Sequence, residues 1–236
     1  MAKTVSYNRP DGGSVNAYLA EPANPANSPG LVVIQEWWGL NDQIRGVADR
    51  FAQAGYRALV PDLYRGKSTI DAEEASHLMD SLNFGDAAGQ DVRGALQYLK
   101  ASGSAKAGVT GFCMGGALTV LSAVHVPEVD AGVSWYGYPP LEFVDAAKIK
   151  APLMGHWALH DVPFPIDGVG KLEEKLRAAG AAYEFYRYDA KHAFFNETQV
   201  GDKKLLPMIE YQPEAAALAW QRTLKFFDQH LGMDRS

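Results

Sequence analysis

Cysteine is scarce in this sequence, because only Cys113 occurs among the 236 residues. A chain with one cysteine cannot form an internal disulfide, which is typical of proteins in a reducing compartment. Acidic residues (28) outnumber lysine and arginine (22), and the net charge of −6 argues against a nucleic-acid partner. No apolar run approaches the length of a membrane span, and the N-terminal segment has no apolar signal-peptide region. We therefore expect a cytoplasmic protein with neither nucleic-acid nor membrane partners.

The pattern of apolar segments predicts strands that alternate with helices. With 47% hydrophobic and 21% charged residues, the composition is that of a globular protein. Short apolar or alternating runs predict strands at 14–20, 31–34, 56–60, 107–110, 132–135, 152–157 and 183–188. Helical spacing predicts helices at 42–54, 71–84, 86–101, 114–124, 166–179 and 213–231. This order predicts an α/β fold in which helices cover both faces of a mostly parallel sheet, with 14–20 as an edge strand. No repeat or linker divides the chain, so we expect one domain over residues 1–236.

Cys113 lies at the centre of the segment Gly-Phe-Cys-Met-Gly-Gly, residues 111–116. The pattern G-x-nucleophile-x-G between a buried strand and a helix is that of a nucleophile elbow, in which a sharp turn exposes the reactive side chain. Helix amides and the helix dipole near a thiol favour its thiolate. A small buried cysteine on a glycine-rich turn is the alternative, but the elbow pattern favours a nucleophile.

A cysteine nucleophile needs a base, and the base needs an orienting acid. Asp161 follows the predicted strand 152–157, and His192 follows the predicted strand 183–188. Ligand sites of open α/β sheets lie beyond the carboxyl ends of the strands, where both residues are expected. The chain order Cys113, Asp161, His192 is that of the α/β-hydrolase fold. The other histidines and acids in competition are His160, His156, His125, His77, Asp167 and Asp189.

Glu36 directly follows the predicted central strand 31–34, within Gln-Glu-Trp-Trp-Gly. A carboxylate there, beside two tryptophans, suggests a functional group, although a helix-terminal anion or a structural ion pair is the alternative. In hydrolases of this chain order, the loop after this strand supplies one oxyanion-hole amide, and the residue after the nucleophile supplies the other. We expect the amides of Trp37 and Met114 in these roles.

These motifs resemble dienelactone hydrolase (carboxymethylenebutenolidase). The resemblance covers roughly residues 14–230 and rests on residues 35–39, 61–64 and 111–116, on Asp161 with Pro163, and on 192–194. It implies a cofactor-free cytoplasmic hydrolase of lactones or small esters with a Cys113, His192 and Asp161 triad. It also implies that Glu36 engages the resting thiol and that substrate binding displaces it. The sequence shows no convincing metal-ligand cluster, so we expect no metal.

The sequence departs from this family at two substrate-binding arginines. The position four residues after the histidine is Asn196, and the segment corresponding to 71–79 offers only His77 as a cation. We therefore expect Trp38, Asn196, Tyr136 and His77 to contact substrate, and we expect less polar, uncharged esters or lactones to be preferred. A non-catalytic small-molecule binder and a redox-sensing thiol are the alternatives. We expect a monomer or a small homo-oligomer.

Overall fold

A computed structural model describes residues 2–233, in which eight strands form one sheet in the order β1-β2-β4-β3-β5-β6-β7-β8. The strands are β1 (Ala2–Asn8), β2 (Ser14–Ala20), β3 (Gly30–Ile34), β4 (Arg57–Pro61), β5 (Ala107–Phe112), β6 (Gly132–Trp135), β7 (Leu153–His160) and β8 (Tyr183–Lys191). β2 runs antiparallel to β1 and to β4, and all other neighbours are parallel. The predicted mostly parallel α/β fold is confirmed.

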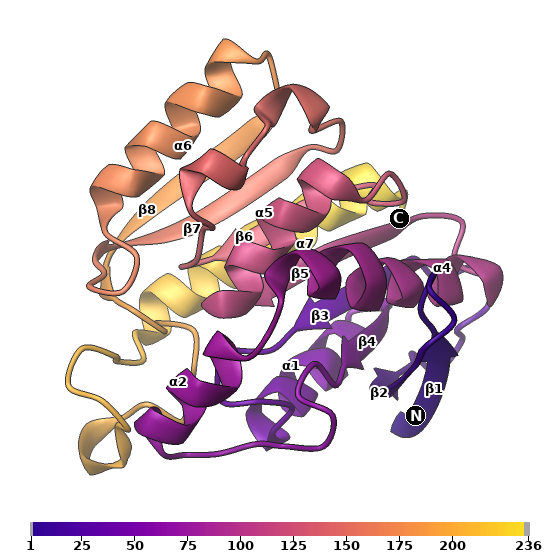
Figure 1. Cartoon of the computed structure of the whole chain (residues 1–236), viewed down its shortest axis with the longest axis horizontal. Helices are drawn as coiled ribbons and strands as arrows, with labels where there is room; N and C mark the ends of the chain where they lie inside the picture. Colours follow the sequence, from indigo (N-terminus) through magenta and orange to yellow (C-terminus); the bar gives the residue numbers. More distant parts are fainter. Residues whose placement is uncertain (1, 234–236) are drawn as a thin grey trace.

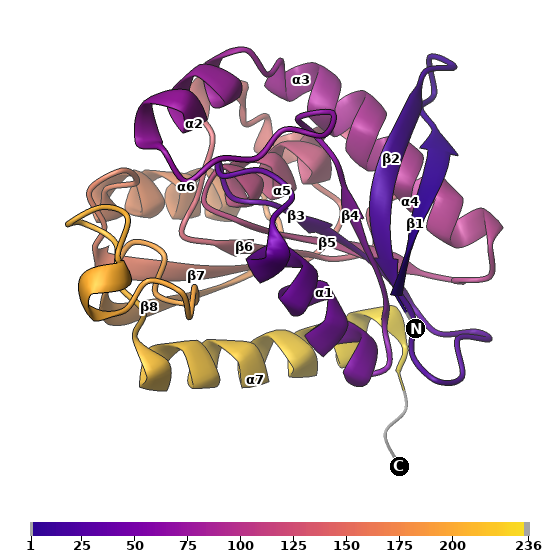
Figure 2. The same cartoon turned by 90° about the horizontal axis from the view of Figure 1, so that it is seen from below.

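Helices cover both faces of this sheet (Figures 1 and 2). α1 and α7 lie on one face, and α4, α5 and α6 lie on the other. The helices are α1 (Asp42–Gln53), α2 (Ala72–Asp80), α3 (Phe84–Asp86), the π-helix η1 (Ala87–Val92), α4 (Arg93–Ala101), α5 (Met114–His125), α6 (Ile166–Ala178) and α7 (Pro213–Leu231), with 3₁₀ turns η2 (Leu141–Phe143), η3 (Ala146–Lys148) and η4 (Gly201–Lys203). Over residues 2–233, no helix combines the length and apolarity needed to cross a bilayer.

The core sits on the two faces of the central strands. Every residue of β3, β4 and β5 is buried, as expected for parallel strands covered by helices on both sides. Gly108 of β5 has no side chain, and a Cβ there would lie 2.9 Å from the ring of Phe227. The glycine therefore lets α7 pack closely on the sheet.

The prediction that 14–20 forms an edge strand was wrong, because β2 pairs on both sides and β1 is the edge. β1 was not predicted, since it buries only Tyr7 and so lacks a clear apolar pattern. The predicted helix 71–84 ends at Asp80. A new helical segment begins at Phe84, because the Asn83 side chain accepts a hydrogen bond from the Asp86 amide and caps it.

The carboxyl ends of four parallel strands position the candidate chemical groups. β3 ends two residues before Glu36, and β5 ends immediately before Cys113. β7 and β8 run three residues further than predicted, so that Asp161 and His192 follow them directly. Parallel pairing brings these strand ends to one edge of the sheet, where side chains from distant parts of the sequence can meet.

Candidate active site

Cys113 occupies a strained turn between β5 and α5. Its φ of 56° and ψ of −119° are unusual for a residue with a side chain, and it is the N-cap of α5. A Cβ on Gly111 would collide with the carbonyl of Gly115, and a Cβ on Gly115 would lie 2.5 Å from the carbonyl oxygen of Ile34. The glycines of the motif are therefore required by backbone contact, as a nucleophile elbow demands.

His192 and Asp161 form a buried hydrogen-bonded pair. The Nδ1 atom of His192 lies 2.7 Å from Oδ2 of Asp161, and the side chains are 5% and 1% exposed. The other carboxylate oxygen of Asp161 accepts a hydrogen bond from the Phe164 amide at 2.8 Å, and the Phe164 ring stacks on the imidazole. This arrangement fixes the imidazole and leaves Nε2 as the nitrogen that can serve Cys113.

The electrostatic surroundings of His192 favour the imidazolium. Burial alone would lower its pKa, but the charge of Cys113 and the hydrogen bonds to Asp161 and Cys113 outweigh burial and raise the pKa to about 10. A thiolate and an imidazolium stabilise each other in the same way that other opposite charges do at short range. The raised pKa of His192 therefore favours a proton on the imidazole beside Cys113.

Glu36 is buried, and both of its carboxylate oxygens accept hydrogen bonds. Tyr136 donates its hydroxyl to Oε1 at 3.2 Å, and Asn196 donates Nδ2 to Oε2 at 2.9 Å. Burial raises the pKa of Glu36, and the charge of His192 and these two hydrogen bonds only partly oppose that rise. No salt bridge between side chains of the described residues includes Glu36.

Tyr136 links Glu36 to His192. Its ring lies edge-on to the imidazole at a centroid distance of 5.1 Å, and its hydroxyl reaches Glu36. The residue adopts a φ of 38°, which is rare for a bulky side chain. The chain thus tolerates backbone strain to hold one aromatic ring against both groups.

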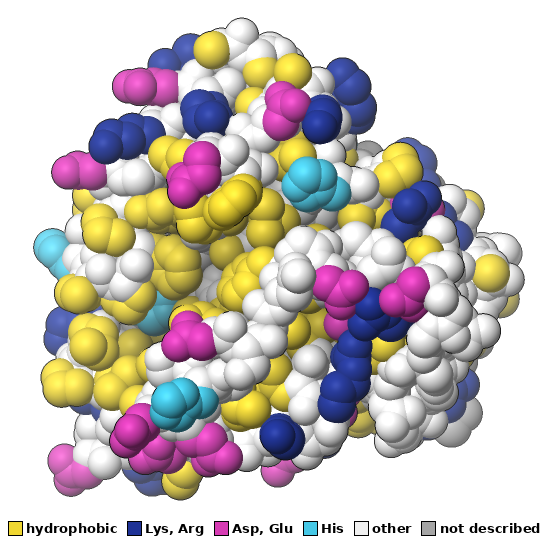
Figure 3. Space-filling model, in the orientation of Figure 1, with side chains coloured by type: hydrophobic (Ala, Val, Ile, Leu, Met, Phe, Trp, Pro, Cys, Tyr) yellow, Lys and Arg dark blue, Asp and Glu magenta, His cyan; other side chains and the backbone are white. Residues whose placement is uncertain are grey.

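A cavity of about 250 Å³ opens beside these groups. Twelve residues line it: Glu36, Trp37, Trp38, Met79, Cys113, Pro163, Phe164, His192, Ala193, Leu206, Met208 and Ile209. Most of these side chains are apolar, and neither lysine nor arginine is among them. Figure 3 shows a hollow on the face seen in Figure 1 that is bordered largely by apolar side chains. A larger hollow of about 700 Å³ lies near α1 and the segment 20–28, but no predicted site residue lines it.

Two backbone amides next to the nucleophile and the carboxylate are available as donors. Met114 is the first residue of α5, and Trp37 follows Glu36 directly. Among the described residues, neither amide is taken up by a hydrogen bond in a turn or loop or by a side chain. Both are thus free to hold a negative oxygen at the mouth of the elbow.

Not all of the predicted substrate-contacting residues line the cavity. Trp38 lines the cavity, whereas Tyr136 and Asn196 lie behind it and contact Glu36. His77 is exposed on α2 and does not line the cavity. Five other lining residues were not predicted, because no motif marks their side chains: Met79, Phe164, Leu206, Met208 and Ile209.

The competing histidines and acids have other surroundings. His156 is fully buried between Tyr188 and Thr223, and His160 pairs with Asp189 at the exposed end of β7. Asp167 lies in the first turn of α6. Over residues 2–233, no group of three or more His, Cys, Asp or Glu side chains is arranged to hold a metal ion.

Residues 15–231 match the Dienelactone hydrolase family. The chain belongs to that family. As a member, it is a hydrolase of the carboxylic ester class.

Two relatives span almost all of the chain. "Protein usf" of Aquifex pyrophilus is 33% identical over 241 aligned residues, which cover 98% of this chain and all of the relative. "Putative carboxymethylenebutenolidase" of Methylorubrum extorquens is 32% identical and covers 92% of this chain and 78% of its own length.

Solved structures show the same fold. The crystal structure of "Putative Dienelactone Hydrolase from Klebsiella pneumoniae" is 29% identical, with a TM-score of 0.82 over 97% of this chain and 99% of that one. The dienelactone hydrolase-like phosphotriesterase P91 from metagenomic libraries has a TM-score of 0.86 over 98% of each chain. At 23% identity, that second likeness concerns the α/β-hydrolase fold alone.

Proposed function

We propose that this dienelactone hydrolase family member cleaves uncharged lactones and small carboxylic esters through a thioester on Cys113. One observation carries the proposal: a strained elbow cysteine and a buried His192–Asp161 pair meet at the wall of a mainly apolar cavity. A nucleophile, a base and an orienting acid in this geometry suit acyl transfer.

Acylation begins with the attack of the Cys113 sulfur on the carbonyl carbon of the substrate. A carbon–sulfur bond forms, and the carbonyl oxygen becomes an oxyanion that accepts hydrogen bonds from the amides of Trp37 and Met114. When the oxyanion collapses, the ester carbon–oxygen bond breaks, and the departing oxygen takes the proton held on Nε2 of His192. With a lactone, the departing oxygen stays attached to the acyl group.

Deacylation reverses the proton transfer. Neutral His192, oriented by Asp161, accepts a proton from water as the water oxygen attacks the thioester carbon. The carbon–sulfur bond then breaks, and the sulfur leaves as a thiolate beside the imidazolium. The product is a carboxylic acid, or a hydroxy acid when the substrate is a lactone.

The lining of the cavity is an argument for an uncharged substrate. Its lining residues include no lysine or arginine, and the nearest acidic side chain, Glu36, lines the wall. A carboxylate on the substrate would lose its hydration in this cavity, and the cationic side chain in the lining, the imidazolium of His192, is already engaged with Cys113 and with the departing oxygen. The side chains of Trp37, Trp38 and Leu206 offer apolar contact instead.

Covalent catalysis is tested with Cys113→Ala. Hydrolysis of 4-nitrophenyl acetate should fall by on the order of a thousandfold or more, as happens when a triad loses its nucleophile. Mass spectrometry of the acid-quenched wild-type enzyme should show an acyl group on Cys113. Hydrolysis by the variant at the wild-type rate would refute the mechanism, and a wild-type protein that binds esters without turnover would indicate a binding protein.

The substrate class is tested with two compounds that differ only in a free carboxylate or its methyl ester, away from the scissile bond. The methyl ester should be preferred in kcat/KM. A preference for the free acid by more than about tenfold, which corresponds to roughly 1.4 kcal/mol, would show that a cation outside this cavity wall binds the carboxylate.

We also propose that the enzyme acts in the cytoplasm. The mechanism requires a free thiol on the only cysteine, Cys113, and a reducing compartment keeps such a thiol free. Fractionation of the source cells, followed by immunoblotting, tests this location.

A further inference from the structure

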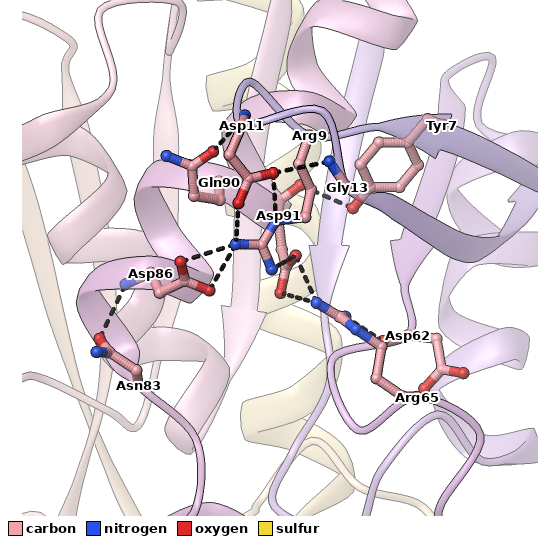
Figure 4. A network of polar contacts seen from close by, with 10 residues as sticks. All are labelled: Tyr7, Arg9, Asp11, Gly13, Asp62, Arg65, Asn83, Asp86, Gln90 and Asp91. Carbon is pink, nitrogen blue, oxygen red and sulfur yellow. Dashed lines mark hydrogen bonds and ion pairs between the residues drawn. The ribbon is translucent and has the colours of Figure 1, made fainter.

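A buried carboxylate outside the cavity joins three parts of the chain (Figure 4). Asp91 lies in the π-helix η1, and its side chain is 1% exposed. Nη2 of Arg65 lies 2.8 and 3.1 Å from its two oxygens, and Nη1 of Arg9 lies 3.3 Å from one of them. A buried carboxylate requires cationic partners. Asp91 therefore holds both arginine side chains close to η1.

Arg65 reaches Asp91 from a tightly curled loop. The residue has a φ of 54°, in the left-handed region that residues with side chains seldom adopt. Its amide and its Nη1 both donate to the carbonyl of Asp62, at 3.3 and 2.8 Å. The guanidinium therefore fixes the curl of the loop after β4 and ties that loop to η1.

This loop touches the nucleophile elbow. The hydroxyl of Tyr64, the neighbour of Arg65, donates to Sδ of Met114 at 3.3 Å. Tyr64 is buried and lies close enough to Cys113 for the two to interact electrostatically. Met114 supplies one of the two amides in the proposed oxyanion hole, so Tyr64 backs that residue from outside the cavity.

The same loop also supports the second side of the oxyanion hole. Ser68 forms an antiparallel bridge with Gly39, and the Thr69 amide donates to the carbonyl of Trp38 at 3.0 Å. Gly39 has a φ of 95°, and a Cβ there would lie 2.6 Å from the carbonyl oxygen of Lys67. The loop thus lies directly against the turn that carries Trp37 and Trp38.

We propose that Asp91 and Arg65 are positioning residues that hold the loop 62–69 against Met114 and Trp38, and thereby set the geometry of the oxyanion hole. Neither side chain lines the cavity. The inference rests on the proposed acyl-transfer function and adds to it a pair of residues that act through the loop. Loss of the pair should affect the step in which an oxyanion forms.

Arg9 provides a matched control on the same carboxylate. It lies in the turn between β1 and β2, where it also pairs with Asp11 and Asp86 at 2.8 Å each. No residue of β1, β2 or their turn lines the cavity. Loss of Arg9 therefore removes at least as many ionic contacts as loss of Arg65 but leaves the loop attached to Asp91.

The experiment compares Arg65→Gln with Arg9→Gln in the full-length chain. Two rates are measured per folded molecule: hydrolysis of 4-nitrophenyl acetate and alkylation of Cys113 by iodoacetamide. Alkylation is a displacement at a saturated carbon and forms no oxyanion. Arg65→Gln should lower kcat for the ester by about tenfold, as displaced catalytic groups do, while KM and the alkylation rate stay within about twofold of wild type. Arg9→Gln should leave all three values within that range.

Two further variants keep the inference testable if Arg65→Gln does not fold. Arg65→Lys retains the charge but not the paired contact, and it should lower kcat by less than Arg65→Gln. Tyr64→Phe removes only the hydroxyl that contacts Met114, and it should lower kcat in the same direction with little change in the unfolding midpoint.

The outcomes separate this inference from the proposed function. Equal losses of kcat in Arg65→Gln and Arg9→Gln, or unchanged kcat in Arg65→Lys and Tyr64→Phe, would overturn the positioning role and leave the thioester mechanism intact. Undiminished turnover by Cys113→Ala would overturn the mechanism itself.

Discussion

Asn196 donates its side-chain amide to Glu36 at 2.9 Å, and its direction is fixed by a third residue. The side-chain oxygen of Asn196, Oδ1, accepts hydrogen bonds from the backbone amide and the hydroxyl of Thr198, at 3.1 and 2.7 Å. Nδ2 must therefore face Glu36, and Oε2 of Glu36 must be an acceptor. When Glu36 is protonated, the proton lies on Oε1, on the side of Tyr136.

The burial of Glu36 predicts how Glu36→Gln changes the dependence of stability on pH. Burial raises the pKa of Glu36 above 4.5, its value in an unfolded chain. Between 4.5 and the raised value, the folded state holds a proton that the unfolded state has lost, so the stability of the wild type falls as pH rises. The variant has no carboxyl group at position 36 and so lacks this loss. The unfolding midpoint of the variant minus that of wild type should therefore be larger at pH 8 than at pH 5. Turnover should fall. Equal midpoint differences at both pH values would contradict the prediction.

The double variant Glu36→Gln with Asn196→Asp exchanges the carboxylate and the amide. Thr198 can still donate to the new carboxylate, and the new amide can donate to it from position 36, so every hydrogen bond is replaced. We expect the double variant to be more stable than Asn196→Asp alone, which places two buried carboxylates together. Recovery of turnover in the double variant would mean that the position of the carboxylate is irrelevant to catalysis. We expect turnover to remain low, as measured with 4-nitrophenyl acetate.

Asp161→Asn should shift the alkaline limb of the pH profile. The pKa of His192 is raised to about 10 because Cys113 and Asp161 together outweigh the effect of burial. An amide at position 161 removes one of these contributions and presents an N–H to Nδ1, which favours the wrong tautomer. We expect kcat/KM to fall by on the order of ten-thousandfold, and the alkaline limb to move to lower pH. The exposed Asp189, which pairs with His160 at 2.6 Å, supplies the control Asp189→Asn. That control should retain the wild-type profile.

Leu206→Ala should widen the acyl preference of the enzyme. Leu206 lines the cavity from the connection before α7, so its truncation opens space for a longer chain. The ratio of kcat/KM for 4-nitrophenyl hexanoate over acetate should rise by on the order of tenfold, the effect of a few methylene groups in an apolar pocket. Leu205→Ala is the matched control, because Leu205 packs on the core without lining the cavity. An equal rise in both variants would indicate a general loosening of the connection.

The chemical groups were predictable from the sequence because each directly follows a strand. Cys113, Asp161 and His192 lie at the carboxyl ends of β5, β7 and β8, and the apolar or alternating patterns of those strands were evident. Trp38 was predicted to contact substrate and does line the cavity, but the part of the wall from the connection before α7 was not predictable in this way. Leu206 and Ile209 lie in a connection without periodicity, held by backbone hydrogen bonds such as that from the Glu210 amide to the His192 carbonyl at 3.1 Å. Such contacts use no distinctive side chain and so leave no pattern in the sequence.

The π-helix is another feature that the sequence did not reveal. Helical spacing predicted one helix over 86–101, but η1 occupies its first part. The carbonyl of Asp91 accepts from the hydroxyl of Tyr7 at 2.7 Å, a contact from a strand that is distant in the sequence. Tertiary contacts of this kind override a local helical preference, and they cannot be read from periodicity alone.

We predict that the buried His156 makes the folded protein less stable in acid, independently of catalysis. Arg222 can only donate, and its Nη1 lies 3.0 Å from the Tyr188 oxygen. The Tyr188 hydroxyl must therefore direct its hydrogen to Nδ1 of His156 at 2.9 Å, which leaves Nε2 to donate to Thr223 at 2.9 Å. The neutral imidazole satisfies both partners, whereas a protonated ring would point a second donor at a hydroxyl that already donates to it.

Burial and then the charge of Arg222 lower the pKa of His156 from 6.5 to about 3. Between these values the unfolded state binds a proton that the folded state does not, so this residue reduces stability as pH falls below 6.5. The loss should reach about 2 kcal/mol at pH 5. We expect His156→Gln to be less stable than wild type at pH 7.5, because an amide replaces only part of the hydrogen bonding. Its stability should nevertheless fall less than that of wild type between pH 7.5 and pH 5 in urea unfolding. Glu36 and the other titrating groups are common to both proteins, so the difference between the two pH slopes isolates His156. Parallel slopes would show that the imidazole is protonated in the folded state or exchanges its partners in acid.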